Sequence, residues 1–220
     1  MKLITYNKIR YSSYNKIVIT LLLSSILFLY LWYLTATQAL WLIKIDQYIN
    51  LIIPNLHNIL LTPIMYYVSE VFEPKLFVLW FTPLLLLLIY KGRWWRSGFL
   101  FFGVGIGQII KTIIKHLTDK SRPDNPFGIV DFATSFPSGH AVAAMFIFLE
   151  VYILVTPLIR KSWQLPVRII LILLMIAVPL SRVYLQVHYI SDIVAGLALA
   201  VASFTFTLLV FHHFIPKDNK

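Results

Sequence analysis

Long apolar runs alternate with short polar segments along almost the whole chain. A helix that crosses a bilayer core of about 30 Å needs roughly 20 residues, so apolar runs of this size predict membrane-spanning helices. Six such runs occur, at about 17–36, 74–91, 97–116, 139–158, 166–184 and 190–212. The pattern therefore predicts an all-α fold, a six-span transmembrane helical bundle that forms one domain over residues 1–220.

The segment 40–73, between the first two predicted spans, has a mixed pattern in which residues such as Lys44, Asp46 and Glu70 interrupt the apolar positions. Such a mixture is typical of amphipathic helices that lie in the membrane interface. We therefore expect an interfacial helical segment there, at the outer face of the membrane. An alternative interpretation makes 57–72 a further span, which would break the orientation argument given below.

The composition agrees with a membrane protein. Hydrophobic residues make up 59% of the chain, whereas about 45–50% is usual in soluble domains, and the mean hydropathy is +0.80. The net charge of +10 would fit a nucleic-acid-binding protein, but most basic residues lie between apolar runs, where orientation signals belong. We therefore exclude nucleic acid as a partner and expect membrane lipids. Because cysteine is absent, disulfides, thiolate metal sites and a cysteine nucleophile are excluded.

The basic residues also predict an orientation. Twelve of the 19 lie in the two tails and in the segments that follow the second and fourth predicted spans. With six spans all four segments fall on one side, which is the cytoplasmic side because cytoplasmic loops carry excess Lys and Arg. We therefore predict a multi-pass protein of the cell (inner) membrane with both termini cytoplasmic. The run 17–36 is expected to be retained, because it is long enough to span and lacks a clear signal-peptide cleavage site.

Three polar clusters, 115–123, 137–140 and 181–192, then fall at the extracytoplasmic face. Charged residues this close to bilayer spans are costly, so they point to function. In the first cluster, Lys115 ends a predicted span and Arg122 lies in the following loop. A point charge and a planar guanidinium can there converge on phosphate oxygens. Taken alone, the pair would be typical of an interface anchor.

The second cluster directly precedes an apolar helix. Ser138 is a natural N-cap residue, and Gly139 lets a ligand approach the backbone closely. The unpaired N–H groups of the first helical turn form an anion site, which His140 would face. Taken alone, the cluster is explained equally by a capped helix start with an incidental histidine.

The third cluster contains Ser181, Arg182, His188 and Asp192. His188 and Asp192 are four residues apart and would share one face of a helix. A carboxylate beside an imidazole fixes its tautomer and makes the opposite ring nitrogen a nucleophile or a base. A cap or surface pair would explain this cluster alone, but the three clusters together predict a phosphate site. Its members are Lys115, Arg122, His140, Arg182, His188 and Asp192.

In order and spacing the clusters resemble the signature of the type 2 phosphatidic acid phosphatase family of membrane enzymes. That signature is Lys-x6-Arg-Pro, then Pro-Ser-Gly-His, then Ser-Arg-x5-His-x3-Asp. The segments 115–123, 137–140 and 181–192 match it at every motif position. The compact length of 220 residues, with no added soluble domain, resembles bacterial members.

The resemblance implies a reaction that needs no metal and no cofactor. His188 would be the nucleophile that forms a phosphohistidine, and Asp192 would orient it. His140 would protonate the leaving oxygen and then activate water. The remaining motif residues would bind the phosphate: Lys115, Arg122, Ser138, Gly139, Arg182 and Ser181.

The resemblance further implies a lipid phosphatase with its active site extracytoplasmic. Undecaprenyl pyrophosphate and phosphatidylglycerol phosphate are the foremost candidate substrates, followed by phosphatidic acid and a phosphorylated lipid A. The same phosphohistidine could instead transfer its phosphoryl group to a lipid, which would make the protein a phosphotransferase. A non-catalytic lipid-phosphate carrier is a more distant alternative, because anion binding does not need an oriented imidazole. The oligomeric state stays open.

Other ionisable residues have less defined roles. Glu150 lies about halfway along the fourth predicted span, roughly 15 Å deeper than His140 at about 1.5 Å per residue, which is too far to reach the phosphate. We expect it to pair within the bundle or to line a polar pocket, with Lys111 only a weak candidate partner. His116 and Lys120 lie beside the first motif and are candidate substrate contacts.

Overall fold

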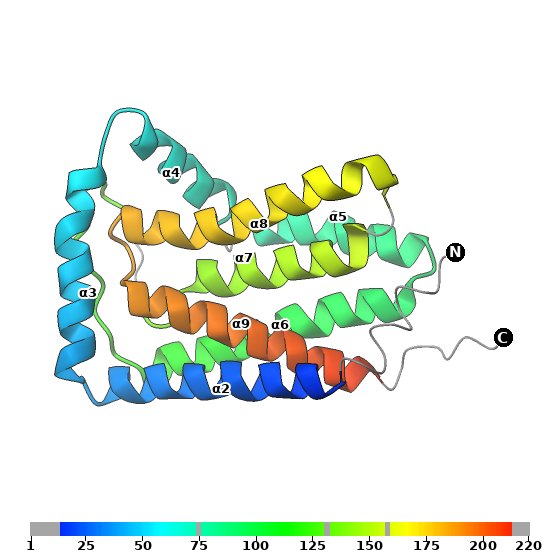
Figure 1. The fold of residues 1–220 in the computed structure, drawn as a ribbon, viewed down its shortest axis with the longest axis horizontal. Coiled ribbons are helices and arrows are strands. Elements are labelled where there is room, and N and C mark those ends of the chain that lie inside the picture. Colours follow the sequence, from blue (N-terminus) through cyan, green and yellow to red (C-terminus); the bar gives the residue numbers. More distant parts are fainter. Residues whose placement is uncertain (1–13, 74–75, 130–132, 157–158, 213–220) are drawn as a thin grey trace.

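The structure is a computed structural model that describes residues 14–73, 76–129, 133–156 and 159–212 (Figure 1). These residues form helices and contain no strand, which confirms the all-α prediction. The elements are α2 (Tyr14–Ala36), α3 (Leu40–Ile52), η1 (Ile53–Leu56), α4 (Leu61–Val71), α5 (Phe77–Tyr90), α6 (Trp94–Leu117), α7 (Gly139–Glu150), η2 (Val151–Val155), α8 (Lys161–Tyr184) and α9 (Ile190–His212).

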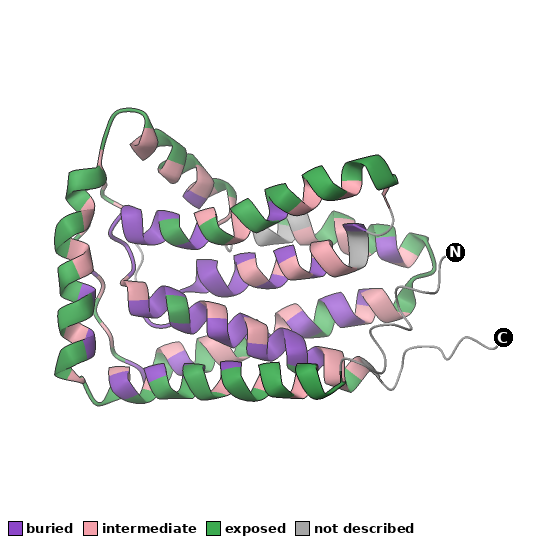
Figure 2. Ribbon diagram, viewed as in Figure 1, coloured by how far each residue is buried: buried purple, intermediate pink, exposed green. Residues whose placement is uncertain are grey.

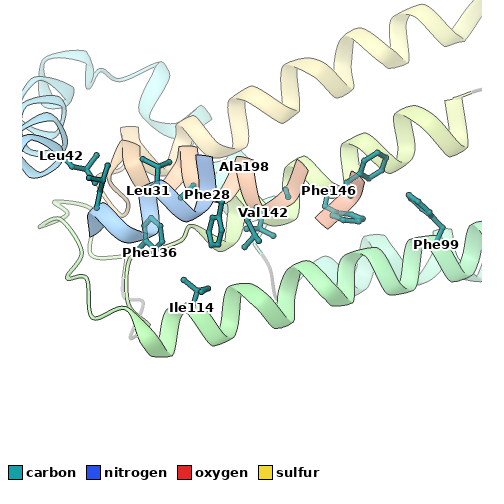
Figure 3. Packing of buried hydrophobic residues seen from close by; sticks show 14 residues of the cluster. Phe28, Leu31, Leu42, Phe99, Ile114, Phe136, Val142, Phe146 and Ala198 are labelled. Atoms are coloured by element: carbon teal, nitrogen blue, oxygen red, sulfur yellow. The ribbon is translucent and has the colours of Figure 1, made fainter. Parts of the chain in front are cut away.

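Helix α9 lies at the centre of the bundle and packs against α2, α6 and α7. Small residues make this possible, because buried alanines such as Ala195 and Ala198 let neighbouring helices approach closely. Figure 3 shows larger apolar side chains from the surrounding helices filling the space between them, among them Phe28 of α2, Ile114 of α6 and Val142 of α7. The core therefore runs lengthwise between the helices.

Helices α2 and α8 expose large apolar side chains along much of their length, as the green stretches in Figure 2 show. Leu22, Leu23 and Ile26 on α2 are examples, as are Leu173 and Ile176 on α8. Apolar surface of this extent is rare on soluble monomers and fits contact with lipid. Four helices of the described part are long and apolar enough to cross a membrane: Tyr14–Ala36, Trp94–Leu117, Lys161–Tyr184 and Ile190–Phe211. The chain is therefore a multi-pass membrane protein.

Two predicted spans are shorter in the structure than in the sequence pattern. The span predicted at 74–91 corresponds to α5, with 14 residues. The span predicted at 139–158 corresponds to the 12 residues of α7 and the five π-helical residues of η2. The apolar pattern does not register this change of helix type at Val151. Residues 74–75 and 157–158, near the ends of these predicted spans, lie outside the described residues. By length and composition, four helices of the described part rather than six qualify as full spans.

The segment 40–73 forms α3, η1 and α4 rather than one long helix. The 11 residues of α4 extend only about 16 Å, too short to cross a bilayer core of about 30 Å. The alternative interpretation of 57–72 as a span therefore loses its support. Helix α3 runs across one end of the bundle, at a steep angle to the long helices (Figure 1).

Candidate active site

Four helix ends meet at the end of the bundle that α3 covers (Figure 1). They are the C-terminal ends of α6 and α8 and the N-terminal ends of α7 and α9, to which the three polar clusters are attached. His140, Arg182, His188 and Asp192 are all buried there, none more than 6% exposed. Burial of so many ionisable side chains is costly unless they are paired and hydrogen-bonded, so their contacts define the site.

The His188 ring and the Asp192 carboxylate face each other, with 3.5 Å between His188 Nδ1 and Asp192 Oδ2. The Ser135 hydroxyl donates to Asp192 Oδ2 and also lies 3.3 Å from His188 Nδ1. The backbone N–H of Tyr189 donates to the same carboxylate oxygen, at 2.9 Å. These contacts fix the carboxylate on the Nδ1 side of the imidazole.

Arg122 occupies the other side of the imidazole. Its Nη1 donates to the Val187 carbonyl oxygen at 2.8 Å and lies 3.1 Å from His188 Nε2, while its Nε donates to the Ala133 carbonyl oxygen at 2.9 Å. A guanidinium is always a donor, so His188 Nε2 must be the acceptor, and the ring proton is assigned to Nδ1. The lone pair of Nε2 thus points toward the cation that the motif predicts to bind phosphate.

The surroundings of His188 keep its imidazole neutral. Burial lowers its pKa, Asp192 opposes this effect, and the positive charges of Arg122 and Arg182 lower it further, so the pKa falls from 6.5 to about 4. At neutral pH the imidazole is therefore unprotonated at Nε2, as a nucleophile must be.

The second motif builds the start of α7 as predicted. The Ser138 side chain caps the helix by accepting from the Ala141 N–H at 3.4 Å, and the Ser138 N–H donates to the Asp192 carbonyl oxygen at 3.1 Å. The second bond ties the start of α7, with Gly139, to the third motif. The next residue, His140, has no hydrogen-bond partner at Nε2 within the described part of the structure.

Arg182 reaches the site from the last turn of α8. Its Nη1 donates to the hydroxyl of Ser69 on α4, and the backbone of Ser69 hydrogen-bonds the His140 ring. Arg182 also lies close enough to His140 and His188 to act on the charge of both rings. Ser69 therefore links a predicted phosphate-binding cation to the predicted acid.

Two further predicted site residues make hydrogen bonds to neighbouring backbone groups. Lys115 Nζ donates to the Thr134 carbonyl oxygen, and the Thr134 hydroxyl donates back to the Lys115 carbonyl oxygen at 3.0 Å. Lys115 thus holds the segment that carries Ser135. The Ser181 hydroxyl donates to the Val178 carbonyl oxygen of its own helix at 2.7 Å, so this hydroxyl is engaged within α8.

Sequence reasoning missed several residues that shape the site. Ser135 precedes the second motif by only two residues, so its proximity was the available signal. Ser69 had no signal, because a single serine in an apolar helix is common. Asp46 was recognisable as a lone carboxylate among apolar residues of α3, but its buried position beside Lys120 was not.

A cavity of about 210 Å³ lies next to this group of residues, between the C-terminal end of α2, helix α3 and the segment after α6. Its walls include Asp46, Asp119, Lys120 and Tyr189. The two histidines and three cations of the motifs do not line it. The cavity is therefore distinct from the predicted phosphate site, and Lys120, which bonds Asp192, forms part of its wall.

Residues 96–216 match the model of the PAP2 superfamily. The match spans more than half of the chain, so the chain belongs to this superfamily, which confirms the resemblance drawn from the motifs. Over 120 residues it is 28% identical to phosphatidylglycerophosphatase B of Bacillus subtilis, covering 53% of this chain and 59% of that protein. Over 127 residues it is 29% identical to a lipid A 1-phosphatase of Rhizobium johnstonii, covering 53% of this chain and 48% of that protein.

A third relative is decaprenylphosphoryl-5-phosphoribose phosphatase of Mycobacterium tuberculosis, 34% identical over 110 residues that cover 47% of this chain and 56% of that protein. The chain thus spans only about half the length of the curated relatives it matches. Among solved structures, the fold is similar to a transmembrane PAP2-type phosphatidylglycerolphosphate phosphatase from Bacillus subtilis, with a TM-score of 0.77 and 21% identity over 91% of this chain and 99% of that chain. It is also similar to Aquifex aeolicus LpxE, with a TM-score of 0.53 and 20% identity over 76% of this chain and 94% of that chain.

Proposed function

We propose that the protein is a metal-independent membrane lipid phosphatase that works through a phosphohistidine intermediate. The observation that carries this proposal is the state of His188. Its Nδ1 faces Asp192, and its Nε2 lone pair faces Arg122. A neutral, oriented imidazole next to a phosphate-binding cation is the arrangement that nucleophilic attack on phosphorus requires.

In the first step, His188 Nε2 forms a bond to phosphorus while the bond from phosphorus to the leaving oxygen breaks; that oxygen belongs to a lipid alcohol in a phosphomonoester and to a lipid phosphate in a pyrophosphate. His140 donates a proton to that leaving oxygen, a role open to it because its Nε2 lacks a partner within the described residues. Asp192 stabilises the positive charge that develops on the His188 ring. The phosphoryl charge is balanced by Arg122, Arg182, Lys115 and the N–H groups at the start of α7.

In the second step, water attacks the phosphorus of phosphohistidine and the nitrogen–phosphorus bond breaks. His140, now unprotonated, accepts a proton from that water, and inorganic phosphate leaves. The motif cations supply the positive charge that metal ions supply in many other phosphoryl-transfer enzymes, so the proposed reaction needs no metal.

We also propose that the bundle crosses the membrane six times, with α5 and α7 as the two shorter spans. The beginning of α2 and the end of α9 lie at the end of the bundle opposite the site (Figure 1). This arrangement supports termini and site on opposite sides of the membrane, and the basic residues of the tails favour the cytoplasmic side for the termini. Because the chain has no cysteine, single substitutions can test it. Thr37→Cys at the site end should react with an impermeant maleimide in intact cells, and Lys91→Cys at the other end should not; the reverse pattern would overturn this orientation.

Lipid phosphates are the proposed substrate class, with phosphatidylglycerol phosphate and undecaprenyl pyrophosphate foremost. Two curated relatives are named for phosphatidylglycerophosphate and lipid A, and a third for a decaprenyl-linked sugar phosphate. All three names join a phosphate to a membrane-anchored lipid. Exposed apolar side chains on α8, such as Ile176 and Leu180, would let such a lipid arrive from the bilayer.

Purified protein in detergent should release inorganic phosphate from a lipid-phosphate panel in the presence of EDTA. His188→Ala should abolish this release. Protein quenched in detergent at alkaline pH, where phosphohistidine is stable, should carry labelled phosphate on His188 but not in that variant. Full activity of His188→Ala would overturn the assignment of the nucleophile. Labelled phosphate that ends on a second lipid rather than in solution would identify a phosphotransferase instead.

A further inference from the structure

A buried ion group lies behind the His188–Asp192 pair, on the side away from the reactive nitrogen. Lys120 Nζ donates to Asp192 Oδ1 at 2.8 Å, to Asp46 Oδ2 at 2.7 Å and to the Ser191 hydroxyl at 2.7 Å. An ammonium has three N–H donors, so these contacts use all of them. The ammonium therefore has a fixed position rather than the mobility usual for a surface lysine.

Asp46 connects this group to α3. Its side chain is buried, and its Oδ1 accepts from the Ser191 N–H at 3.1 Å. Its Oδ2 accepts from the Ser191 hydroxyl at 2.6 Å. Ser191 directly precedes Asp192 in the first turn of α9. Helix α3 lies outside the superfamily match, which begins at residue 96, yet it is bonded to the backbone next to the predicted catalytic carboxylate.

The contacts divide the Asp192 carboxylate into two halves. Oδ1 accepts a hydrogen bond from Lys120 Nζ. Oδ2 accepts hydrogen bonds from the Ser135 hydroxyl and the Tyr189 N–H, and it faces the His188 ring. A carboxylate held at both oxygens cannot rotate without breaking charge-assisted hydrogen bonds, which are the stronger kind. Because Lys120 holds Oδ1, the other oxygen, Oδ2, is the one that faces the His188 imidazole.

We propose that Lys120 and Asp46 are positioning residues for the reaction. They hold the Asp192 carboxylate in a fixed orientation and set the net charge beside the His188 ring. The inference rests on the proposed function, because it concerns the rate and pH dependence of the same phosphoryl transfer. Lys120 places a positive charge against the buried Asp192 carboxylate, and Asp46 balances the ammonium. Two carboxylates and one ammonium leave a net charge of −1 beside the imidazole.

This charge balance predicts opposite effects for the two partners. Among the described residues, the other charged or titratable groups near His188 are Arg122, Arg182 and His140, and the Tyr189 ring lies against Lys120. None of these residues is altered when Lys120 or Asp46 is replaced. Removal of Lys120 leaves two carboxylates beside the ring, which favours its protonated form. Removal of the Asp46 charge leaves a neutral ion pair, which favours the neutral ring.

The experiment measures the acid limb of kcat/KM against pH for the wild type and four variants: Lys120→Met, Lys120→Arg, Asp46→Asn and the double variant Asp46→Asn/Lys120→Met. In Lys120→Met the limb should move to higher pH by about one unit or more, because a nearby unit charge shifts a pKa by about that much. Lys120→Arg should keep the wild-type limb, and Asp46→Asn should move it to lower pH. The double variant restores the net charge of −1 and should return the limb close to that of the wild type.

An unmoved limb in folded Lys120→Met would overturn the proposal. Should Lys120→Met fail to fold, Asp46→Asn and the double variant carry the same test, since they differ only at residue 120. The limb of the double variant should lie at the higher pH, and identical limbs would overturn the proposal. A wild type without activity on any lipid phosphate would refute the proposed function itself. An active wild type with unmoved limbs would refute only the role of Lys120 and Asp46.

Discussion

Gly196 of α9 lies directly against the carbonyl oxygen of Ser138, so closely that a Cβ atom at residue 196 would be 2.8 Å from that oxygen. The same atom would be 2.9 Å from the Cβ of Ala141. Contacts this short force one element to move, and neither neighbour is a flexible side chain. Gly196 therefore determines how closely the start of α7, the predicted anion site, approaches α9 and the Asp192 carboxylate in its first turn.

Gly196→Ala should consequently lower activity more than stability. The added methyl group displaces Ser138, Gly139 and His140 from the phosphate position, and we expect kcat to fall by about tenfold or more, since small misplacements of reacting groups have large effects on rate. Steady-state kinetics and thermal unfolding of the same preparation would separate the two quantities. Gly105→Ala is the matched control, because a Cβ there meets no atom within 4 Å. Equal kinetics for both variants would contradict the argument.

Ser69→Ala tests whether α4 takes part in the site. The Ser69 hydroxyl accepts from Arg182, and hydrogen bonds to charged groups are worth about 1.5–3 kcal/mol. We expect kcat/KM to fall by about tenfold, because the guanidinium then loses a group that fixes its direction. Ser97→Ala supplies the control, since Ser97 is buried near the start of α6 and, within the described residues, its hydroxyl donates to the carbonyl oxygen of Arg93, the N-cap of that helix. A comparable loss in both variants would indicate a packing effect.

The sequence predicted the parts of the site that obey local rules and missed those that depend on tertiary contacts. Ser138 was recognisable as an N-cap, which the structure confirms. The spacing of His188 and Asp192 predicted one shared helix face, which was wrong: the two side chains face each other, but His188 lies before α9 and only Asp192 is in the helix. The bonds from Asp46 to Lys120 and from Ser69 to Arg182 join segments that are distant in the chain, and no periodicity encodes them. The apolar pattern predicted helices in six regions, of which four are long enough to span, whereas α5 and α7 are shorter than predicted. It could not show that the chain becomes π-helical after Glu150, because hydropathy does not report helix type.

The depressed pKa of His188 makes a prediction for stability against pH. The ring binds a proton near pH 4 in the folded protein and near pH 6.5 in the unfolded chain, so between these values the unfolded chain binds more protons. The free energy of unfolding therefore rises with pH across this window, and up to about 3 kcal/mol is lost as pH falls from 6.5 to 4. Thermal unfolding at several pH values should show that, as pH falls from 6.5 to 4, the unfolding temperature decreases more steeply for the wild type than for His188→Gln. Parallel curves would contradict the assigned pKa.

Glu150 offers a separate test, because its side chain is fully buried and neither carboxyl oxygen has a hydrogen-bond partner within the described residues. The predicted pairing within the bundle is not seen there: Lys111 donates to Gln108 Oε1 at 2.6 Å instead. A buried polar group without a partner costs about 1–3 kcal/mol, so Glu150→Met should raise the thermal unfolding temperature, whereas Glu150→Gln, which keeps the polar atoms, should not. Both variants should retain wild-type kcat/KM, since residue 150 lies about 15 Å along the helix from His140. A loss of activity in both, without a loss of stability, would instead assign the buried carboxyl a role in the reaction.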